Sequence, residues 1–240
     1  MAQPEEIISA MNTVISLALF ILFSSCGRIE IPRPEPELHY YFVELQTNPD
    51  RAILPNDEAL AIQEAHLVNI ERLHQEGKLV AAGPFDGGGG VFILKAPSIR
   101  HARRWVDSDP AVQANRFLAP IFRMQIEFGG IYTVGENHEM ITTTYCQFIH
   151  DSDLPLTEHQ LLVHHEFIAD LAEFGHVLLG GKLGKTGNYL LIMSLENEKE
   201  LEKLVTLHPL VIDGTLDYDL RLLWIAQETF IETSPSQTDD

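Results

Sequence analysis

The chain has 240 residues, 45% of them hydrophobic and 21% charged, and its 16 basic and 35 acidic side chains give a formal net charge of −19. This composition is typical of a soluble globular protein with one large domain or two of about 100 residues. The acidity excludes nucleic acid as a partner, because binding to phosphates depends on clustered Lys and Arg. It also disfavours direct attachment to an anionic membrane face.

An apolar run lies near the N-terminus. Residues 14–23 (VISLALFILF) are followed directly by Ser24, Ser25 and Cys26. The run is half as long as the roughly 20 residues that a transmembrane helix needs, but its length suits the core of a signal peptide. A cysteine directly after small residues is typical of bacterial lipoproteins. We therefore expect a lipoprotein-type signal peptide at 1–25, lipidation at Cys26, and export to a bacterial envelope with this lipid anchor as the only membrane contact.

Two features of this region depart from the lipoprotein pattern. Phe23 stands where a leucine is usual, and the segment before the run contains Glu5 and Glu6 but no Lys or Arg. A translation start at Met11 would remove both glutamates. The alternatives are an ordinary N-terminal anchor or a chance apolar stretch in a cytoplasmic protein. The three prolines within 29–38 indicate that 26–38 is an extended tether, and the polar end of the chain, 232–240, is expected to be a disordered tail.

The chain contains an internal repeat. The segment EAHLVNIERLHQEGKLVAAGP, at 64–84, aligns with LVHHEFIADLAEFGHVLLGGK, at 162–182, with an offset of 98 residues. Continuing this alignment with the same offset matches the strand segment 91–94 to 189–192. After one inserted residue, Asp109-Pro110 aligns with His208-Pro209. The sequence thus predicts two repeats, at 39–130 and 141–231.

The order of helices and strands in each repeat can be predicted from its sequence. The aromatic and β-branched residues at 39–45 predict a strand. A helix is expected from an N-cap at Asn56 to Gly77. Strands at 78–82 and 91–95, a helix that Ser98 caps, and a strand at 121–128 complete the first repeat, and the second follows the same order. The order β-α-β-β-α-β is that of a ferredoxin-like unit. We therefore expect an α+β protein in which two ferredoxin-like repeats form an intramolecular dimeric α+β barrel.

Several motifs of the first repeat closely resemble the YciI-like (YCII-related) family of dimeric α+β barrel proteins. These are AHLVNIERLHQEGKLVAAGP, the strand VFILKA, and ARRWVDSDPAV. The resemblance covers about 90 residues and, more weakly, the second repeat. It implies an enzyme whose paired His and Asp lie in a cleft, which places the pair at His66 and Asp109. Relatives in the same superfamily act as small-ring isomerases, lyases and dehalogenating eliminases.

The residues themselves allow two interpretations of each member of the pair. His66 shares a helical face with Ile62, Ile70 and Leu73, so its side chain should point toward the sheet. A histidine beside a carboxylate is a good general base, but a core histidine bonded to a backbone carbonyl has the same spacing. Asp109 stands directly before a proline, as an N-cap residue does, so its carboxylate could orient the histidine, cap a helix, or do both.

The second repeat keeps the histidine, at His164, but has His208 in the position of Asp109. We interpret this half as a degenerate site that completes the barrel. The alternative, a metal bound by His164, His165 and His208, lacks a known ligand spacing. We thus expect acid–base chemistry of the lyase or isomerase type, with no cofactor or metal, on a small anionic or enolisable molecule. A non-catalytic binding or structural barrel is the alternative, and two chains could also associate into a homodimer.

The net charge divides unevenly between the repeats. Residues 39–128 hold nine basic and eleven acidic side chains, a charge of −2, whereas residues 141–230 hold five and fourteen, a charge of −9. The second half of the first repeat gathers several arginines, so an anionic ligand is compatible with it. They are Arg100, Arg103, Arg104, Arg116 and Arg123.

Overall fold

The computed structural model describes residues 36–135, 138–184, 188–194 and 198–231, and Glu37–Asp240 form a unit of their own. The predicted signal peptide, the lipidation at Cys26, most of the tether and the predicted tail lie outside the described residues. Within the described ranges, no helix is long and apolar enough to cross a membrane.

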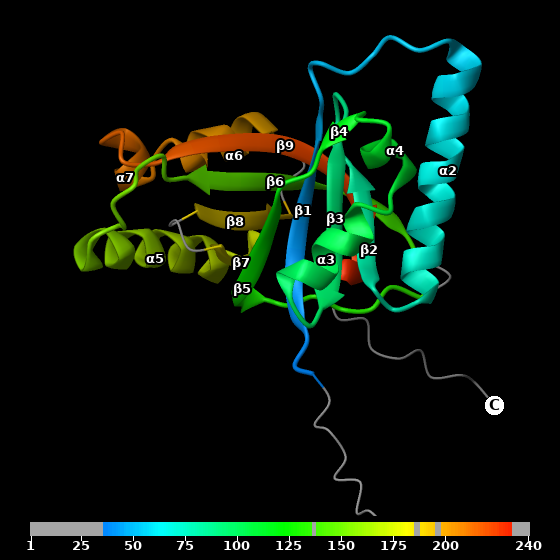
Figure 1. The fold of residues 1–240 in the computed structure, drawn as a ribbon. Coiled ribbons are helices and arrows are strands. Elements are labelled where there is room, and N and C mark those ends of the chain that lie inside the picture. Colours follow the sequence, from blue (N-terminus) through cyan, green and yellow to red (C-terminus); the bar gives the residue numbers. More distant parts are fainter. Residues whose placement is uncertain (1–35, 136–137, 185–187, 195–197, 232–240) are drawn as a thin grey trace, which may run out of the picture. The chain divides into compact units, whose positions relative to one another are not determined.

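The first half of the unit contains a strand, a long helix, a two-stranded hairpin, two short helices and two further strands (Figure 1). The helix α2 ends before Gly77, whose φ of +66° is the left-handed conformation that a residue after a helix commonly adopts. In chain order the elements are β1 (His39–Thr47), α2 (Asn56–Gln75), β2 (Leu79–Pro84), β3 (Gly90–Ala96), α3 (Ile99–Val106), α4 (Pro110–Gln113), β4 (Phe117–Leu118) and β5 (Ile121–Gly129).

The second half has the same order without a counterpart of β4. A capping box at Thr157 and Gln160 begins its long helix, in which the Thr157 hydroxyl accepts from the Gln160 amide. In chain order the elements are β6 (Met140–Ile149), α5 (Glu158–Glu173), β7 (Val177–Leu183), β8 (Asn188–Met193), α6 (Glu198–Val205), α7 (Pro209–Ile212), β9 (Asp217–Ala226) and the 3₁₀ turn η1 (Gln227–Thr229).

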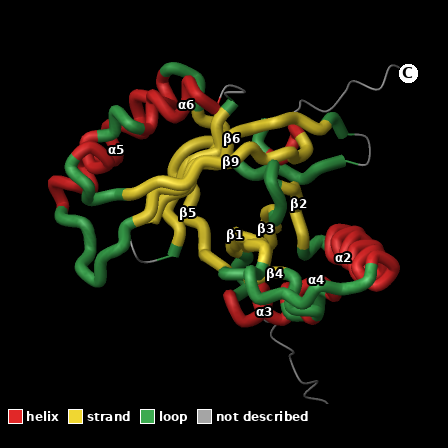
Figure 2. The backbone as a smooth tube through the Cα atoms, turned by 90° about the horizontal axis from the view of Figure 1, so that it is seen from above, coloured by secondary structure: helices red, strands yellow, loops and turns green. Residues whose placement is uncertain are grey.

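One antiparallel sheet runs through both halves, in the order β2-β3-β1-β5-β7-β8-β6-β9. Pairing between β5 and β7 joins the halves on one side. On the other side β2 approaches β9, where Phe85 and Leu223 form a bridge and the Asp86 amide donates to the Leu222 carbonyl at 3.0 Å. The sheet therefore curves into a nearly closed barrel with helices outside it (Figure 2). The predicted α+β barrel class is confirmed.

The buried apolar side chains form three clusters. One joins strands of both halves inside the barrel, and includes Phe42, Ile93, Leu190 and Ile192. A second packs the first-half strands against their helices, and the third does the same in the second half. Alternate residues of each strand thus face the barrel interior and the helices, and both faces of the sheet are buried.

The predicted alignment of the repeats is wrong by one residue in β8. The hairpin β2–β3 pairs Ala81 with Ile93, and the hairpin β7–β8 pairs Leu179 with Ile192. Leu179 follows Ala81 by 98 positions, but Ile192 follows Ile93 by 99, so the inserted residue lies in the second hairpin and not after the strand. Because side chains alternate between faces, a slip of one residue exchanges inside for outside.

Two predicted helix caps also differ from the structure. Asn56 is the first residue of α2 and not its cap, and the N-cap position is held by Pro55 without a side-chain hydrogen bond. Ser98 does hold the predicted N-cap position of α3, but its hydroxyl bonds to the His101 ring at 2.9 Å and not to a backbone amide. Neither difference moves the helix that the sequence predicted.

Candidate functional site

The site is built around His66, which lies in the middle of α2 on the face toward the sheet. Its side chain is buried, with 7% of the residue exposed. The imidazole stacks on Phe92 of β3 with ring centroids 5.7 Å apart, and lies 5.9 Å from the ring of Phe117. The helical spacing therefore predicted the direction of this side chain correctly, because α2 presents one residue in every three or four to the sheet.

Asp109 lies at the start of the short helix α4 and is fully buried. One carboxylate oxygen, Oδ1, accepts hydrogen bonds from the Ala111 amide at 2.9 Å and the Val112 amide at 3.3 Å. Pro110 follows as the first helical residue. The capping role that the sequence indicated is thus present, and it fixes the carboxylate in one position.

The same carboxylate holds the histidine. His66 Nδ1 lies 2.9 Å from Oδ1 and 2.8 Å from Oδ2 of Asp109. Burial by itself would raise the pKa of Asp109, but the hydrogen bonds from His66, Asn69 and the Val112 amide, and the positive charge that His66 carries when it is protonated, bring that pKa below its ordinary value. An ionised carboxylate only accepts hydrogen bonds, so Nδ1 carries the proton and Nε2 of the neutral ring is left with its lone pair.

Two polar side chains of α2 that were not among the predicted site residues complete this network. The Asn69 side-chain amide donates to Asp109 Oδ2 at 2.9 Å, and the Arg72 guanidinium donates to Asn69 Oδ1 at 2.7 Å. Asn69 follows His66 by three residues and Arg72 follows Asn69 by three, so each side chain lies beside the one before it on the helix surface. That spacing was the signal that could have found them.

A cavity of about 440 Å³ adjoins His66. It lies between α2 and the strands β2 and β3, and none of its described lining residues is Lys, Arg, Asp or Glu. The polar side chains in the lining are His66 and Gln63, which precedes it by three residues. The apolar and aromatic side chains include Leu45, Leu67, Ile70, Phe92, Phe117 and Trp224. The cavity therefore suits a small ligand with a large apolar surface.

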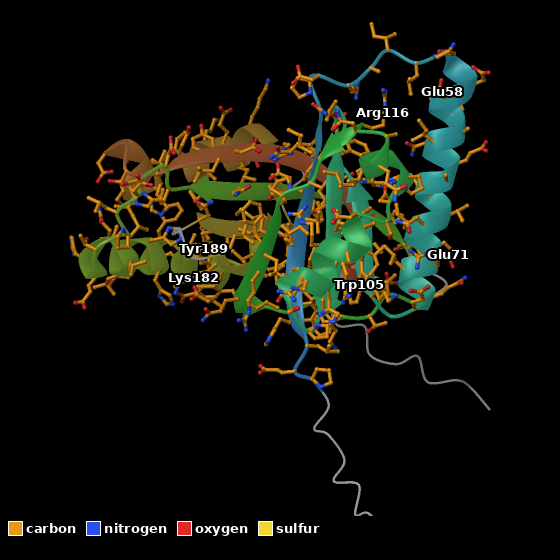
Figure 3. The ribbon with its side chains drawn as sticks, viewed as in Figure 1. Glu58, Glu71, Trp105, Arg116, Lys182 and Tyr189 are labelled. Atoms are coloured by element: carbon orange, nitrogen blue, oxygen red, sulfur yellow. The ribbon has the colours of Figure 1, made fainter. Side chains whose placement is uncertain are left out.

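None of the five arginines in the second half of the first repeat lines this cavity. Arg103 donates to the Ala119 carbonyl at 3.0 Å, and Arg116 donates to the Ala52 carbonyl at 2.7 Å, beside the loop that leads into α2 (Figure 3). Arg123 bonds to the ring of His39. The arginine-rich segment therefore does not support the expected anionic ligand at this position.

The equivalent pair in the second half consists of two histidines. His208 caps α7, and its Nδ1 accepts from the Leu210 amide at 3.0 Å. That bond leaves the proton of the neutral ring on Nε2, which lies 2.9 Å from Nδ1 of His164 and donates to it. His164 must then carry its own proton on Nε2, the opposite arrangement to His66. This Nε2 is buried and has no hydrogen-bond partner among the described residues.

Both histidines of this pair are poor bases. Burial, together with the neighbouring charges of His208, Lys182 and His165, lowers the pKa of His164 to about 3. Burial lowers the pKa of His208 to about 4. The metal alternative is not supported either, because His165 is exposed and its ring lies against Phe128, with centroids 5.6 Å apart, and not with the other two. The expectation that the second site is degenerate agrees with this geometry.

Two further replacements fill the space around His164. The centroid of the His164 ring lies 4.7 Å from that of Tyr189. Figure 3 labels Tyr189 and, near it, Lys182 in the second half. In the corrected register Tyr189 corresponds to Gly90, a residue that lines the His66 cavity. Phe167 stands where the first half has Asn69, and its ring lies 4.4 Å from that of His208. Aromatic packing therefore replaces both the cavity and the polar network of the first half.

Comparisons with known proteins agree with the motifs of the first half. The YCII-related domain matches residues 40–125, which include His66, Asn69 and Asp109. Two curated relatives, each named Protein YciI, come from Escherichia coli O6:H1 and Shigella flexneri. Each is 35% identical over 69 residues, covering 24% of this chain and 70% of the relative. Among solved structures, an anthrone oxidase-like protein is 8% identical with a TM-score of 0.46, covering 84% of this chain and 98% of its own.

Proposed function

The chain belongs to the YCII-related family, and from the site that its first half carries we propose that it is an enzyme which moves a proton on a small molecule. His66 is the general base, and Asp109 is the positioning residue that holds it. The chemistry is of the lyase or isomerase type and requires no redox cofactor. The ligand is an enolisable molecule, with most of its surface apolar, bound in the cavity beside His66.

The observation that carries this proposal is the contact between His66 Nδ1 and the buried carboxylate of Asp109. The fixed carboxylate of Asp109 accepts a hydrogen bond from Nδ1–H, so Nε2 is the only ring nitrogen that can accept a proton. In the reaction, a carbon next to a carbonyl, or a hydroxyl, loses its proton to Nε2, and the electron pair moves into the conjugated system of the substrate. Asp109 stabilises the imidazolium that forms.

The proton then has two destinations. In an isomerisation, Nε2 returns it to another carbon of the same conjugated system. In an elimination, the electron pair expels a leaving group and the imidazolium passes its proton to that group or to water. Both routes balance without an oxidant or a reductant. A substrate oxygen that gains charge needs a hydrogen-bond donor, and the Gln63 side-chain amide, one turn before His66 in the cavity lining, can donate that bond.

The second candidate function is a non-catalytic protein that binds a small apolar ligand. The cavity favours it as much as it favours an enzyme, since its walls are largely apolar and uncharged. The two candidates differ in the need for His66. A binding protein requires the shape of the cavity, whereas the enzyme requires a lone pair on Nε2.

Exchange of carbon-bound hydrogen for deuterium tests the proposal across whole classes of substrate at once. We would incubate the full chain in D₂O with a panel of small unsaturated lactones, cyclic ketones and phenols and follow the loss of proton signals by NMR. Wild type should accelerate exchange in at least one class, and His66→Gln should lower that rate by about a hundredfold to ten-thousandfold.

The chain offers a matched control in His164→Gln, which changes the same residue type at the equivalent buried position in the second half. This variant should exchange at the wild-type rate, because His164 is protonated on Nε2 and cannot act as a base. Equal rates for wild type and His66→Gln across the panel, with both proteins folded, would reject the enzyme and leave the binding function.

A further inference from the structure

The second half of the chain contributes a side chain to the cavity of the first half. Trp224 belongs to β9, yet it lines the cavity beside His66. It reaches this position because the edges of β9 and β2 meet. Their backbones are so close that a Cβ added at Gly83 would lie 2.4 Å from the Trp224 carbonyl oxygen. About half of Trp224, 51%, is exposed. The site is therefore incomplete without the second half.

The close contact that closes the barrel between β9 and β2 does not require a tryptophan at position 224. The equivalent contact on the other side is between β5 and β7, where a Cβ added at Gly181 would lie 2.2 Å from the Gln125 carbonyl oxygen. Gln125 thus holds the position in β5 that Trp224 holds in β9. The backbone makes the same close approach with a glutamine as with a tryptophan, so only the side chain distinguishes the two positions.

We infer that Trp224 is a specificity residue that selects a flat, unsaturated ring by stacking against it. This inference rests on the proposed function and names its substrate class: one ring or two fused rings bearing an acidic hydroxyl or enol. An indole side chain that is half-exposed in the protein can bury its apolar surface by stacking on a flat π-system. The same cavity is lined by His66 and by Phe92 and Phe117, whose rings lie against the His66 ring, so a ring stacked on Trp224 would share the cavity with the proposed base.

The charge of the lining supports the same class. A phosphate or a dicarboxylate would lose its hydration here without a Lys or Arg among the described lining residues to replace it. A neutral phenol or enol loses much less, and its single acidic proton is the one that His66 takes. The volume of about 440 Å³ lies near the lower end of the range for small-molecule sites.

Calorimetric titration of the full chain with 2-naphthol, and with its fully saturated analogue decahydro-2-naphthol, tests this inference. The two probes share a hydroxyl and a carbon skeleton and differ in flatness and π-electrons. Wild type should bind 2-naphthol more tightly. Trp224→Ala should weaken that binding roughly threefold to tenfold and leave the saturated probe unchanged, while Trp224→Phe should retain most of the affinity.

The other tryptophan of the chain gives the matched control. Trp105 lies on α3 (Figure 3) and is absent from the cavity lining, so Trp105→Ala should bind both probes as wild type does. His66→Gln should keep the preference for 2-naphthol, so that loss of proton transfer and loss of ring recognition are separate results. The inference is overturned if wild type fails to bind 2-naphthol, or if Trp224→Ala weakens both probes equally or neither.

Discussion

Each half of the barrel carries a histidine at the equivalent position of its long helix, His66 on α2 and His164 on α5. The halves differ in the residue that caps the short helix beside this histidine. In the first half the cap is Asp109, and in the second it is His208. Both caps accept hydrogen bonds from backbone amides, at Ala111 and at Leu210. The structural role is therefore the same in both halves while the chemical consequence is reversed.

The reversal comes from the number of acceptor atoms that each cap has. A carboxylate that accepts from the backbone can still accept from His66, which leaves Nε2 of His66 free of a proton. The neutral His208 ring has a single acceptor, which the Leu210 amide occupies, so His208 can only donate to His164. The residue that caps the helix thus determines which nitrogen of the neighbouring imidazole carries the proton. The comparison predicts that changing the cap should change the tautomer.

The largest expected effect is that of Asp109→Asn. The asparagine Oδ1 can still accept from the Ala111 and Val112 amides, but its NH₂ group would face Nδ1 of His66. We expect this NH₂ group to donate to Nδ1, so that His66 carries its proton on Nε2, as His164 does. We expect proton transfer to fall about a hundredfold to ten-thousandfold. Nitrogen-15 NMR of the imidazole would report the change of tautomer directly.

Asp109→Ala is the comparison variant, because it removes the cap together with the orienting group. It should lose more stability than Asp109→Asn, by about 1 kcal/mol. An Asp109→Asn protein that kept both the wild-type tautomer of His66 and the wild-type rate would break the proposed link between the cap and the base.

Acid should destabilise the second half through its histidine pair. The ordinary histidine pKa of 6.5 applies to the unfolded chain, whereas burial holds the folded pKa of His164 near 3 and that of His208 near 4. As the pH falls from 6.5 toward 4, the unfolded state therefore binds protons that the folded state does not. The free energy of unfolding should decrease by about 1 kcal/mol per pH unit for each imidazole.

Urea unfolding between pH 7.5 and 4.5 would measure this slope, with His208→Asn as the variant. The asparagine can still cap α7 but does not titrate, so the decrease in stability over this range should be smaller than in wild type by the share of one imidazole. If the stability of both proteins decreased equally with falling pH, His208 would not have the lowered pKa that its burial predicts.

The sequence predicted those parts of the site that depend on local spacing. The face of α2 that His66 occupies and the cap at Asp109 both follow from residues a few positions apart, and both predictions are confirmed. The offset in β8 was wrong because the inserted residue lies in a hairpin, where no periodic pattern records it. Trp224 was missed because a residue of β9 reaches the first half only when the barrel closes, and no local pattern encodes that contact.

The smallest expected effect is a coupling between two replacements in the second half. His208→Asp alone would place a carboxylate against the ring of Phe167, without the amide that Asn69 supplies in the first half. Phe167→Asn alone would remove buried apolar surface. Together they recreate the polar network, so the double variant should be more stable than the sum of the single changes by about 1–3 kcal/mol. It should also move the His164 proton from Nε2 to Nδ1, visible by nitrogen-15 NMR. Strict additivity, with the His164 tautomer unchanged, would mean that the fold around His164 and not the cap sets its protonation.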